Sequence, residues 1–151
     1  MSTEKRKIAY IDGKPYEIGD HHTSILKFVK SYLGDKKVPT LCDDPNLAPY
    51  GACRVCSVEV ALVKDGPTKV VASCHTPVAE HQHIFTNNEN LEKLRKNIVE
   101  LVLTDHPMEC ATCEVNNNCE LQTVANDLGI SDHRYNKPKQ HKGIPRDTSH
   151  D

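Results

Sequence analysis

Four potential metal ligands lie within fourteen residues of this chain, in the stretch H-P-M-E-C-A-T-C-E-V-N-N-N-C. One imidazole and three thiols are spaced H-x3-C-x2-C-x5-C, as His106, Cys110, Cys113 and Cys119. Ligands this close in sequence can converge on one metal centre without help from distant segments. The stretch therefore predicts a loop that folds around a metal centre.

A second group of cysteines lies upstream with the spacing C-x10-C-x2-C-x17-C, as Cys42, Cys53, Cys56 and Cys74. The seven cysteines and His106 make eight ligands, which is two complete sets of four with no cysteine left over. Thiolates hold iron–sulfur clusters in fours, and histidine can replace cysteine in such sets. Iron–sulfur ligation is therefore the leading hypothesis for both groups.

Zinc remains an alternative, because paired C-x2-C units occur in zinc ribbons as well as in clusters. The first set would then be a four-cysteine zinc site, or a set of free structural cysteines, and the second a site of three cysteines and one histidine. In the cluster interpretation, the segment that wraps the first centre contains Gly51, Ala52 and Arg54. A glycine there lets backbone N–H groups approach the sulfides closely.

The composition limits the core and the partners of the chain. It has 151 residues, 37% of them hydrophobic, with two Phe and no Trp, so we expect a thin apolar core that metal centres help to stabilise. A formal net charge of -2 gives no basic footprint for nucleic acid or for a membrane surface. We see no signal peptide and no apolar run of spanning length, and we expect a cytoplasmic protein whose thiols stay reduced.

The first part of the chain reads as an α+β sheet domain ending near residue 86. Asp12-Gly13 has the pattern of a hairpin turn, and Thr23 or Ser24 can cap a helix that Gly34 ends. In the strand from residue 57 to 63, Val58, Val60 and Leu62 should share one face. The other expected strands span 5–11, 16–18, 69–73 and 83–86.

The second part reads as helical. Thr86-Asn87-Asn88-Glu89 fits a capping box, and the expected apolar face of the helix that follows consists of Leu91, Leu94, Ile98, Leu101 and Val102. His106 and Pro107 should end this helix. A further helix spans 120–128, and the chain beyond Ile130 is polar, with cations that we expect to be solvated. We therefore predict three segments: 1–86, 87–130, and an extended tail over 131–151.

The motifs P-T-L-C-x10-C-R-V-C-S-V-E-V, A-S-C-H-T-P-V and H-P-M-E-C-A-T-C-E-V-N-N-N-C-E-L-Q together resemble a known family. They are similar to the N-terminal region of the large peripheral iron–sulfur subunit of complex I. The same region occurs in iron-only hydrogenases, NAD-dependent formate dehydrogenases and the small diaphorase subunit of NAD-reducing hydrogenases. The resemblance covers nearly all of residues 5–135.

The resemblance implies a β-grasp, ferredoxin-like domain followed by a small helical domain. It assigns a 2Fe–2S cluster to Cys42, Cys53, Cys56 and Cys74, and a 4Fe–4S cluster to His106, Cys110, Cys113 and Cys119. It also implies an electron-transfer subunit, with electron bifurcation left open. The expected partners are a flavin-containing, NADH-oxidising iron–sulfur subunit and a catalytic oxidoreductase subunit.

The sequence departs from this family in two respects. Many members continue into a module with two further 4Fe–4S clusters and a catalytic domain, whereas the given sequence ends at Asp151, and its x17 spacing is longer than the family's. No G-x-G-x-x-G motif indicates a nicotinamide site of its own. We therefore expect no substrate site, and a tail that lies over a partner subunit. A zinc-stabilised interaction module and a free-standing soluble ferredoxin are the rival hypotheses.

Overall fold

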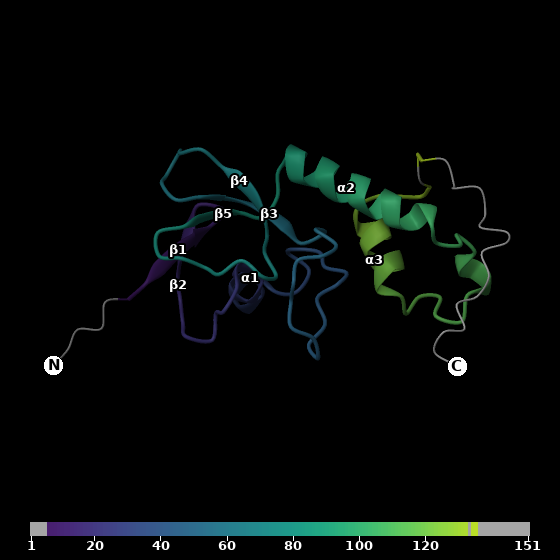
Figure 1. Cartoon of the computed structure of the whole chain (residues 1–151), viewed down its shortest axis with the longest axis horizontal. Helices are drawn as coiled ribbons and strands as arrows, with labels where there is room; N and C mark the ends of the chain where they lie inside the picture. Colours follow the sequence, from purple (N-terminus) through teal and green to yellow (C-terminus); the bar gives the residue numbers. More distant parts are fainter. Residues whose placement is uncertain (1–5, 133, 136–151) are drawn as a thin grey trace, which may run out of the picture.

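The computed structural model describes residues 6–132 together with 134 and 135. It combines a five-stranded sheet with α-helices and one short 3-10 helix (Figure 1). The elements are, in order, β1 (Ile8–Ile11), β2 (Lys14–Glu17), α1 (Ile25–Leu33), β3 (Ser57–Ala61), β4 (Lys69–Ala72), β5 (His83–Phe85), α2 (Glu89–Thr104), η1 (Cys110–Thr112) and α3 (Glu120–Asp127).

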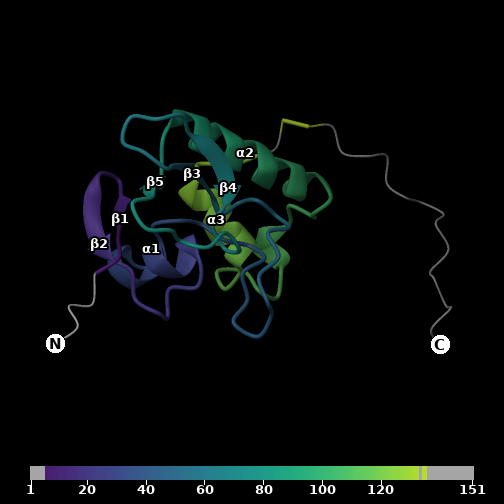
Figure 2. The ribbon, with the colours of Figure 1, turned by 60° about the vertical axis from the view of Figure 1, so that its left-hand side comes forward.

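The sheet is mixed and has the strand order β2-β1-β5-β3-β4. Only β1 and β5 pair in parallel, and the other neighbours are antiparallel. Helix α1 lies against one face of the sheet, as Figures 1 and 2 show from two directions. Its buried side chains share a core with those of the strands, so the predicted α+β arrangement of this part is confirmed.

Local turn chemistry produced the first elements as predicted. Asp12 and Gly13 both have positive φ values, 49° and 83°, which is the geometry of a tight hairpin turn. Ser24 caps α1 by accepting a hydrogen bond from the Lys27 amide, and Gly34 ends the helix with a φ of 83°. None of these signals depends on contacts with distant residues.

The predicted strand over 57–63 is shorter in the structure. Val58 and Val60 are buried as expected, whereas Leu62 is 68% exposed. The ladder between β3 and β4 ends at the pair Val60–Lys69, so the chain beyond Ala61 already belongs to the hairpin loop. The predicted strand therefore extends two residues too far, and Leu62 lies outside it.

Helix α2 begins two residues later than a capping box at Thr86 would place it. Asn88 is the N-cap, and its side chain accepts the hydrogen bond from the Leu91 amide at 2.9 Å. Thr86 does not cap the helix, because its amide and hydroxyl both donate to the carboxylate of Asp12. The helix ends at Thr104, just before His106 and Pro107, in agreement with the prediction.

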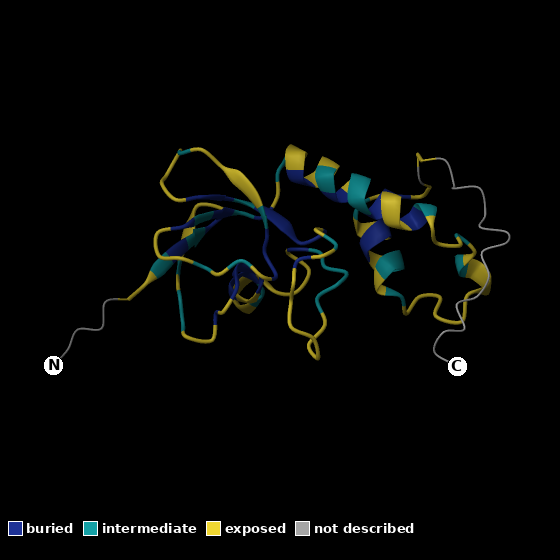
Figure 3. Ribbon diagram, in the orientation of Figure 1, coloured by how far each residue is buried: buried dark blue, intermediate teal, exposed yellow. Residues whose placement is uncertain are grey.

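The buried face of α2 differs from the predicted one. Leu101 is 53% exposed and Val102 is 40% exposed, although both were assigned to the apolar face. Leu91 is buried as predicted, and Ile98 is partly buried against the helical core. The other buried positions, Arg95, Val99, Glu100 and Leu103, were not predicted. Figure 3 shows this buried side of α2 turned toward α3.

A second core lies between α2 and α3. Val99 and Leu103 from α2 meet Val124 and Ala125 from α3, and Val55 from the loop before β3 completes the cluster. Val55 is fully buried. Val55, which lies between Cys53 and Cys56 of the first cysteine group, thus belongs to the core of the helical part.

The first residues of the predicted tail contact α2. Nε of Arg134 lies 2.7 Å from a carboxylate oxygen of Glu100, so this tail cation is paired and not simply solvated as the sequence predicts. The remainder of the tail, 136–151, lies outside the described residues. Within the described part, no helix is long and apolar enough to span a lipid bilayer.

Candidate metal centres

Cys56 and Cys74 are brought together by the pairing of β3 with β4. Cys56 directly precedes β3, and Cys74 follows the end of β4 by two residues; Ser57 pairs with Ala72 in the ladder. Beyond that pair, the Ser73 hydroxyl donates to the Cys56 carbonyl at 2.7 Å. Both cysteines are only 2% exposed.

Cys42 joins these two thiols. Burial raises the pKa of the Cys74 thiol to about 12, with further upward contributions from Cys56 and then Cys42, whose charges lie close by. The Gly51 backbone N–H lies beside the Cys74 sulfur and opposes this rise in the pKa. Three sulfurs of the predicted set and one backbone N–H therefore lie near one another.

Cys53 completes the predicted set from the C-x2-C loop. It is half-buried and packs against the second core. Arg54, the next residue, has a positive φ of 64°, and its carbonyl accepts hydrogen bonds from the amide and the hydroxyl of Ser57. The side chains of Ala52 and Arg54 are exposed, and their predicted contact with a cofactor stays a prediction.

The second set of predicted ligands lines a single cavity of about 270 Å³ next to α3. All four members, His106, Cys110, Cys113 and Cys119, contribute to its wall. A water molecule needs only about 10–15 Å³ of such space, so the cavity has room for a group much larger than one ion. No Asp, Glu, Lys or Arg is among its lining residues.

Helix ends position these four side chains. His106 follows the C-cap of α2, Cys110 begins η1, Cys113 caps the end of η1, and Cys119 is the N-cap of α3. The amide of Cys113 donates to the carbonyl of Cys110 at 3.2 Å, which fixes their separation along the turn.

The ligand geometry suits a cluster better than one ion. Among the described residues, no three His, Cys, Asp or Glu side chains are close enough together to hold a single metal ion. Tetrahedral zinc would require four ligands at about 2.0–2.3 Å from one point. Thiols and an imidazole spread around an uncharged cavity match the soft ligands and the larger size of an iron–sulfur cluster.

Comparison with protein families agrees with this division of the ligands. Residues 8–89 match the model described as a 2Fe-2S iron-sulfur cluster binding domain, which spans more than half of the chain. The chain belongs to this iron–sulfur family. Residues 95–134 match a second model, described as the NADH-ubiquinone oxidoreductase-G iron-sulfur binding region. The prediction of a 2Fe–2S region followed by a 4Fe–4S region is thereby confirmed at the level of regions, and the individual ligands stay predictions.

Curated relatives match nearly the whole chain but are much longer proteins. The chain is 34% identical to the NADPH-Fe(3+) oxidoreductase subunit alpha of Geobacter sulfurreducens over 137 residues, which is 91% of this chain and 15% of that protein. It is 37% identical to an NADH-quinone oxidoreductase subunit of Buchnera aphidicola subsp. Schizaphis graminum over 136 residues, 88% of this chain and 14% of that protein. The chain thus spans about a seventh of the length of these relatives.

A solved structure shares the fold. A chain of the NAD+-reducing [NiFe]-hydrogenase, crystallised in its H2-reduced state, aligns with a TM-score of 0.73 over 86% of this chain and 52% of that chain. The sequence identity is 22%, so the likeness concerns the fold alone. It supports the ferredoxin-like arrangement of the 2Fe–2S domain.

Sequence reasoning missed residues that position the ligands. Gln122 on α3 accepts a hydrogen bond from the Asn117 amide at 2.8 Å and donates to the Asn116 side chain at 2.9 Å. It thereby holds the loop that leads into Cys119, in which Asn117 has a positive φ of 64°. The only signal for this contact in the sequence is that Gln122 follows Asn117 by five residues and Asn116 by six, which is close enough for a local hydrogen bond.

Gly51 offers a sharp test of the first centre. Its φ is 72°, and a Cβ atom there would lie 3.3 Å from the Cβ of Ala72. We expect Gly51→Ala to displace the amide that lies beside the Cys74 sulfur and to lower the occupancy of the 2Fe–2S cluster severalfold. Visible absorption and iron content of the purified variant measure this loss.

Gly34→Ala is the matched control for that variant. Gly34 has a φ of 83°, and a Cβ there would meet no atom within 4 Å. Both variants place an alanine at a positive φ, which costs about 1–3 kcal/mol. Equal cluster occupancy in the two variants would contradict a specific role for the Gly51 amide.

Proposed function

We propose that this chain transfers single electrons between two iron–sulfur clusters inside a larger oxidoreductase. Cys42, Cys53, Cys56 and Cys74 would hold a 2Fe–2S cluster, and His106, Cys110, Cys113 and Cys119 a 4Fe–4S cluster. The observation that carries the proposal is the cavity beside α3, since all four ligands predicted for the second cluster line it. The clusters, when bound, supply reversible one-electron chemistry at iron.

The residues of the chain have three tasks in this function. The thiols and the imidazole anchor the two clusters, and the Gly51 amide stabilises negative charge at Cys74. Apolar side chains such as Leu103, Leu121 and Ile130 line part of the second cavity and limit the access of water to it. Solvent access and hydrogen bonding around a bound cluster set its reduction potential.

The relatives suggest the kind of complex in which this transfer takes place. Their names describe an NADPH-Fe(3+) oxidoreductase and NADH-quinone oxidoreductases. We propose that electrons arrive from a flavin-containing, NADH-oxidising partner subunit and leave toward a catalytic subunit. The segments 1–86, 87–130 and 131–151 would serve as first cluster unit, second cluster unit and docking tail. A cytoplasmic location stays a prediction.

Metal analysis of the anaerobically purified chain tests the proposal. Two irons in one cluster and four in the other give about six iron and about six acid-labile sulfide per chain. Dithionite should reduce both clusters and produce two separate EPR signals, and the chain alone should not oxidise NADH. Stoichiometric zinc with no acid-labile sulfide would contradict the proposal and favour a zinc-stabilised module instead.

A further inference from the structure

Arg95 is a buried cation at the junction between the sheet and α2. Its side chain is only 3% exposed, and it lies on the inner face of the helix. One terminal nitrogen, Nη2, donates to the Ser57 carbonyl at 2.6 Å and to the Thr86 carbonyl at 2.8 Å. The other, Nη1, lies 3.3 Å from the side-chain oxygen of Asn87. The guanidinium therefore links α2 to the start of β3 and the end of β5.

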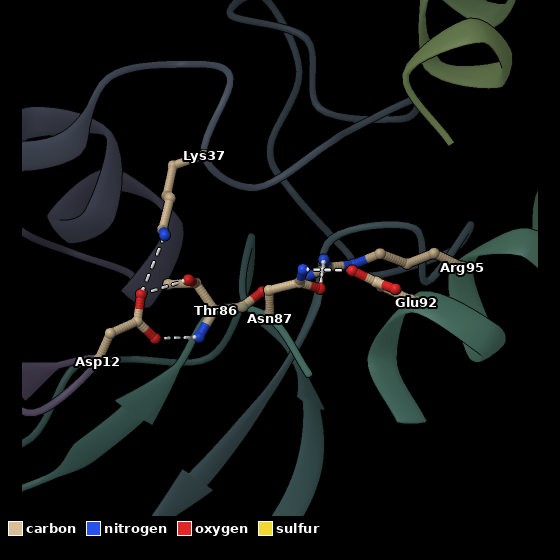
Figure 4. A network of polar contacts seen from close by, with 6 residues as sticks. All are labelled: Asp12, Lys37, Thr86, Asn87, Glu92 and Arg95. Carbon is tan, nitrogen blue, oxygen red and sulfur yellow. Dashed lines mark hydrogen bonds and ion pairs between the residues drawn. The ribbon is translucent and has the colours of Figure 1, made fainter. Parts of the chain in front are cut away.

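The surroundings hold this guanidinium in one place. Figure 4 shows the polar chain that leads from Lys37 through Asp12 and Thr86 to the junction. Thr86 is fully buried, donates its amide and hydroxyl to Asp12, and accepts from Arg95 with its carbonyl. Asp12 is held by both Lys37 and Thr86, and Thr86 is held by both Asp12 and Arg95. Arg95 therefore has little freedom to move toward solvent.

The charge of Arg95 lacks a counter-charge in direct contact. Among the ion pairs of the described residues none includes Arg95, and its Nε is buried without a hydrogen-bond partner. Burying an unpaired charge is costly, and a chain with a thin core has little free energy to spare for it. A nearby anion would offset this cost.

The first candidate metal centre lies next to this charge. The carbonyl that Arg95 binds most closely belongs to Ser57, the residue directly after Cys56. Burial lowers the pKa of Arg95, whereas the neighbouring Cys56, and then Glu92, raise it, so the cation and the sulfur interact electrostatically. A cluster of ferric ions, sulfides and four thiolates is an anion in both redox states and becomes more negative on reduction.

We propose that Arg95 is a positioning residue that holds a fixed positive charge beside the 2Fe–2S cluster and thereby raises its reduction potential. This inference rests on the proposed ligand set of the first cluster. An external reductant supplies one electron, which converts one ferric ion of the cluster to ferrous, while Arg95 keeps its proton throughout. The fixed charge stabilises the reduced, more negative state more than the oxidised state, because both lie in a region of low dielectric constant.

The experiment compares Arg95→Gln with Arg95→Lys in the full chain carrying both clusters. Glutamine and lysine both carry N–H donors, but only lysine keeps the charge. EPR-monitored redox titration should show a tenfold loss in the reduction equilibrium constant of the first cluster in Arg95→Gln, which is about 59 mV for one electron. Arg95→Lys should lie closer to the wild type, and the potential of the second cluster should change less in both.

Lys96→Gln is the matched control, because Lys96 is the next residue of the same helix and its side chain is exposed. This variant also removes one positive charge, but that charge lies in solvent, where salt screens it. The shift in the reduction potential of the first cluster should therefore be much smaller than in Arg95→Gln. An Arg95→Gln protein with a full first cluster and a potential shift no larger than that of Lys96→Gln would overturn the inference. Failure of both Arg95 variants to take up the first cluster would overturn it too, leaving Arg95 a role in folding. Absence of a 2Fe–2S signal in the wild type would instead contradict the proposed function.

Discussion

Replacing Cys113 with serine is expected to remove the second cluster and leave the first fully occupied. Cys113 lines the cavity beside α3 but belongs to neither hydrophobic core, and its side chain is exposed. The substitution therefore removes a ligand at little cost to folding. Iron should fall from about six to about two per chain, and the EPR signal of the 4Fe–4S cluster should disappear.

Two further variants show whether this loss is specific. Cys53→Ser should give the converse result, with the 2Fe–2S signal lost and the 4Fe–4S signal retained. Thr112→Ser changes the residue next to Cys113, keeps the hydroxyl that bonds to the Glu109 carbonyl, and should leave both clusters intact. If Cys113→Ser abolished both signals in a folded protein, the division into two independent ligand sets would be wrong.

Replacing Val55 with aspartate is expected to abolish both clusters, although Val55 is no ligand. The valine is fully buried and packs in the core that α2 and α3 share. An unpaired carboxylate there costs several kcal/mol, a large part of the stability of a chain of this size. Val55→Ala should be milder, with a cost of about 2 kcal/mol and partial loss of the second cluster. Thermal unfolding and the two EPR signals measure both effects.

Val63→Asp is the control for this effect. It makes the same substitution at a valine that lies beyond the other end of β3 and is 60% exposed. The unfolding temperature and both clusters should remain close to those of the wild type. An unchanged second cluster in Val55→Asp would show that the helical core does not depend on the loop between Cys53 and Cys56.

Features encoded in a few neighbouring residues could be predicted from the sequence. The turn at Asp12-Gly13, the cap at Ser24 and the end of α1 at Gly34 all follow from local backbone chemistry, and each occurs as expected. The helix predicted over 120–128 also occurs, as α3, and Val124 and Ala125 are its buried residues. In these cases, tertiary packing reinforces a preference that the local sequence already has.

The buried face of α2 could not be predicted in the same way, because a charged residue lies at its centre. Leu91, Arg95, Val99 and Leu103 are spaced by four residues and share one side of the helix. A search for apolar periodicity passes over Arg95 and assigns the exposed Leu101 to the core. The arginine can be buried only because carbonyls of β3 and of the residue after β5 accept its hydrogen bonds.

The same distinction between local and distant contacts applies to the candidate sites. Spacing was sufficient to group His106 with three cysteines, since the loop between α2 and α3 is short and its four predicted ligands line one cavity. It was also sufficient to suggest Gly51, whose amide lies beside the Cys74 sulfur. Spacing could not show that Val55 packs against Val99 and Leu103, because that contact joins segments more than forty residues apart.

The loop from Cys53 to Cys56 sends its side chains to both sides of the boundary predicted at residue 86. Cys56 lies in the core of the sheet, and Val55 lies in the core of the helices. A fragment cut after residue 86 would therefore carry an uncovered valine between two of its own ligands, and would lack Arg95 altogether. Exchange of this 2Fe–2S unit for a self-contained ferredoxin would require a redesign of position 55 and its helical neighbours. The sheet part and the helical part follow one another in sequence, but neither can be replaced without changes in the other, because Val55 of the first part packs in the core of the second.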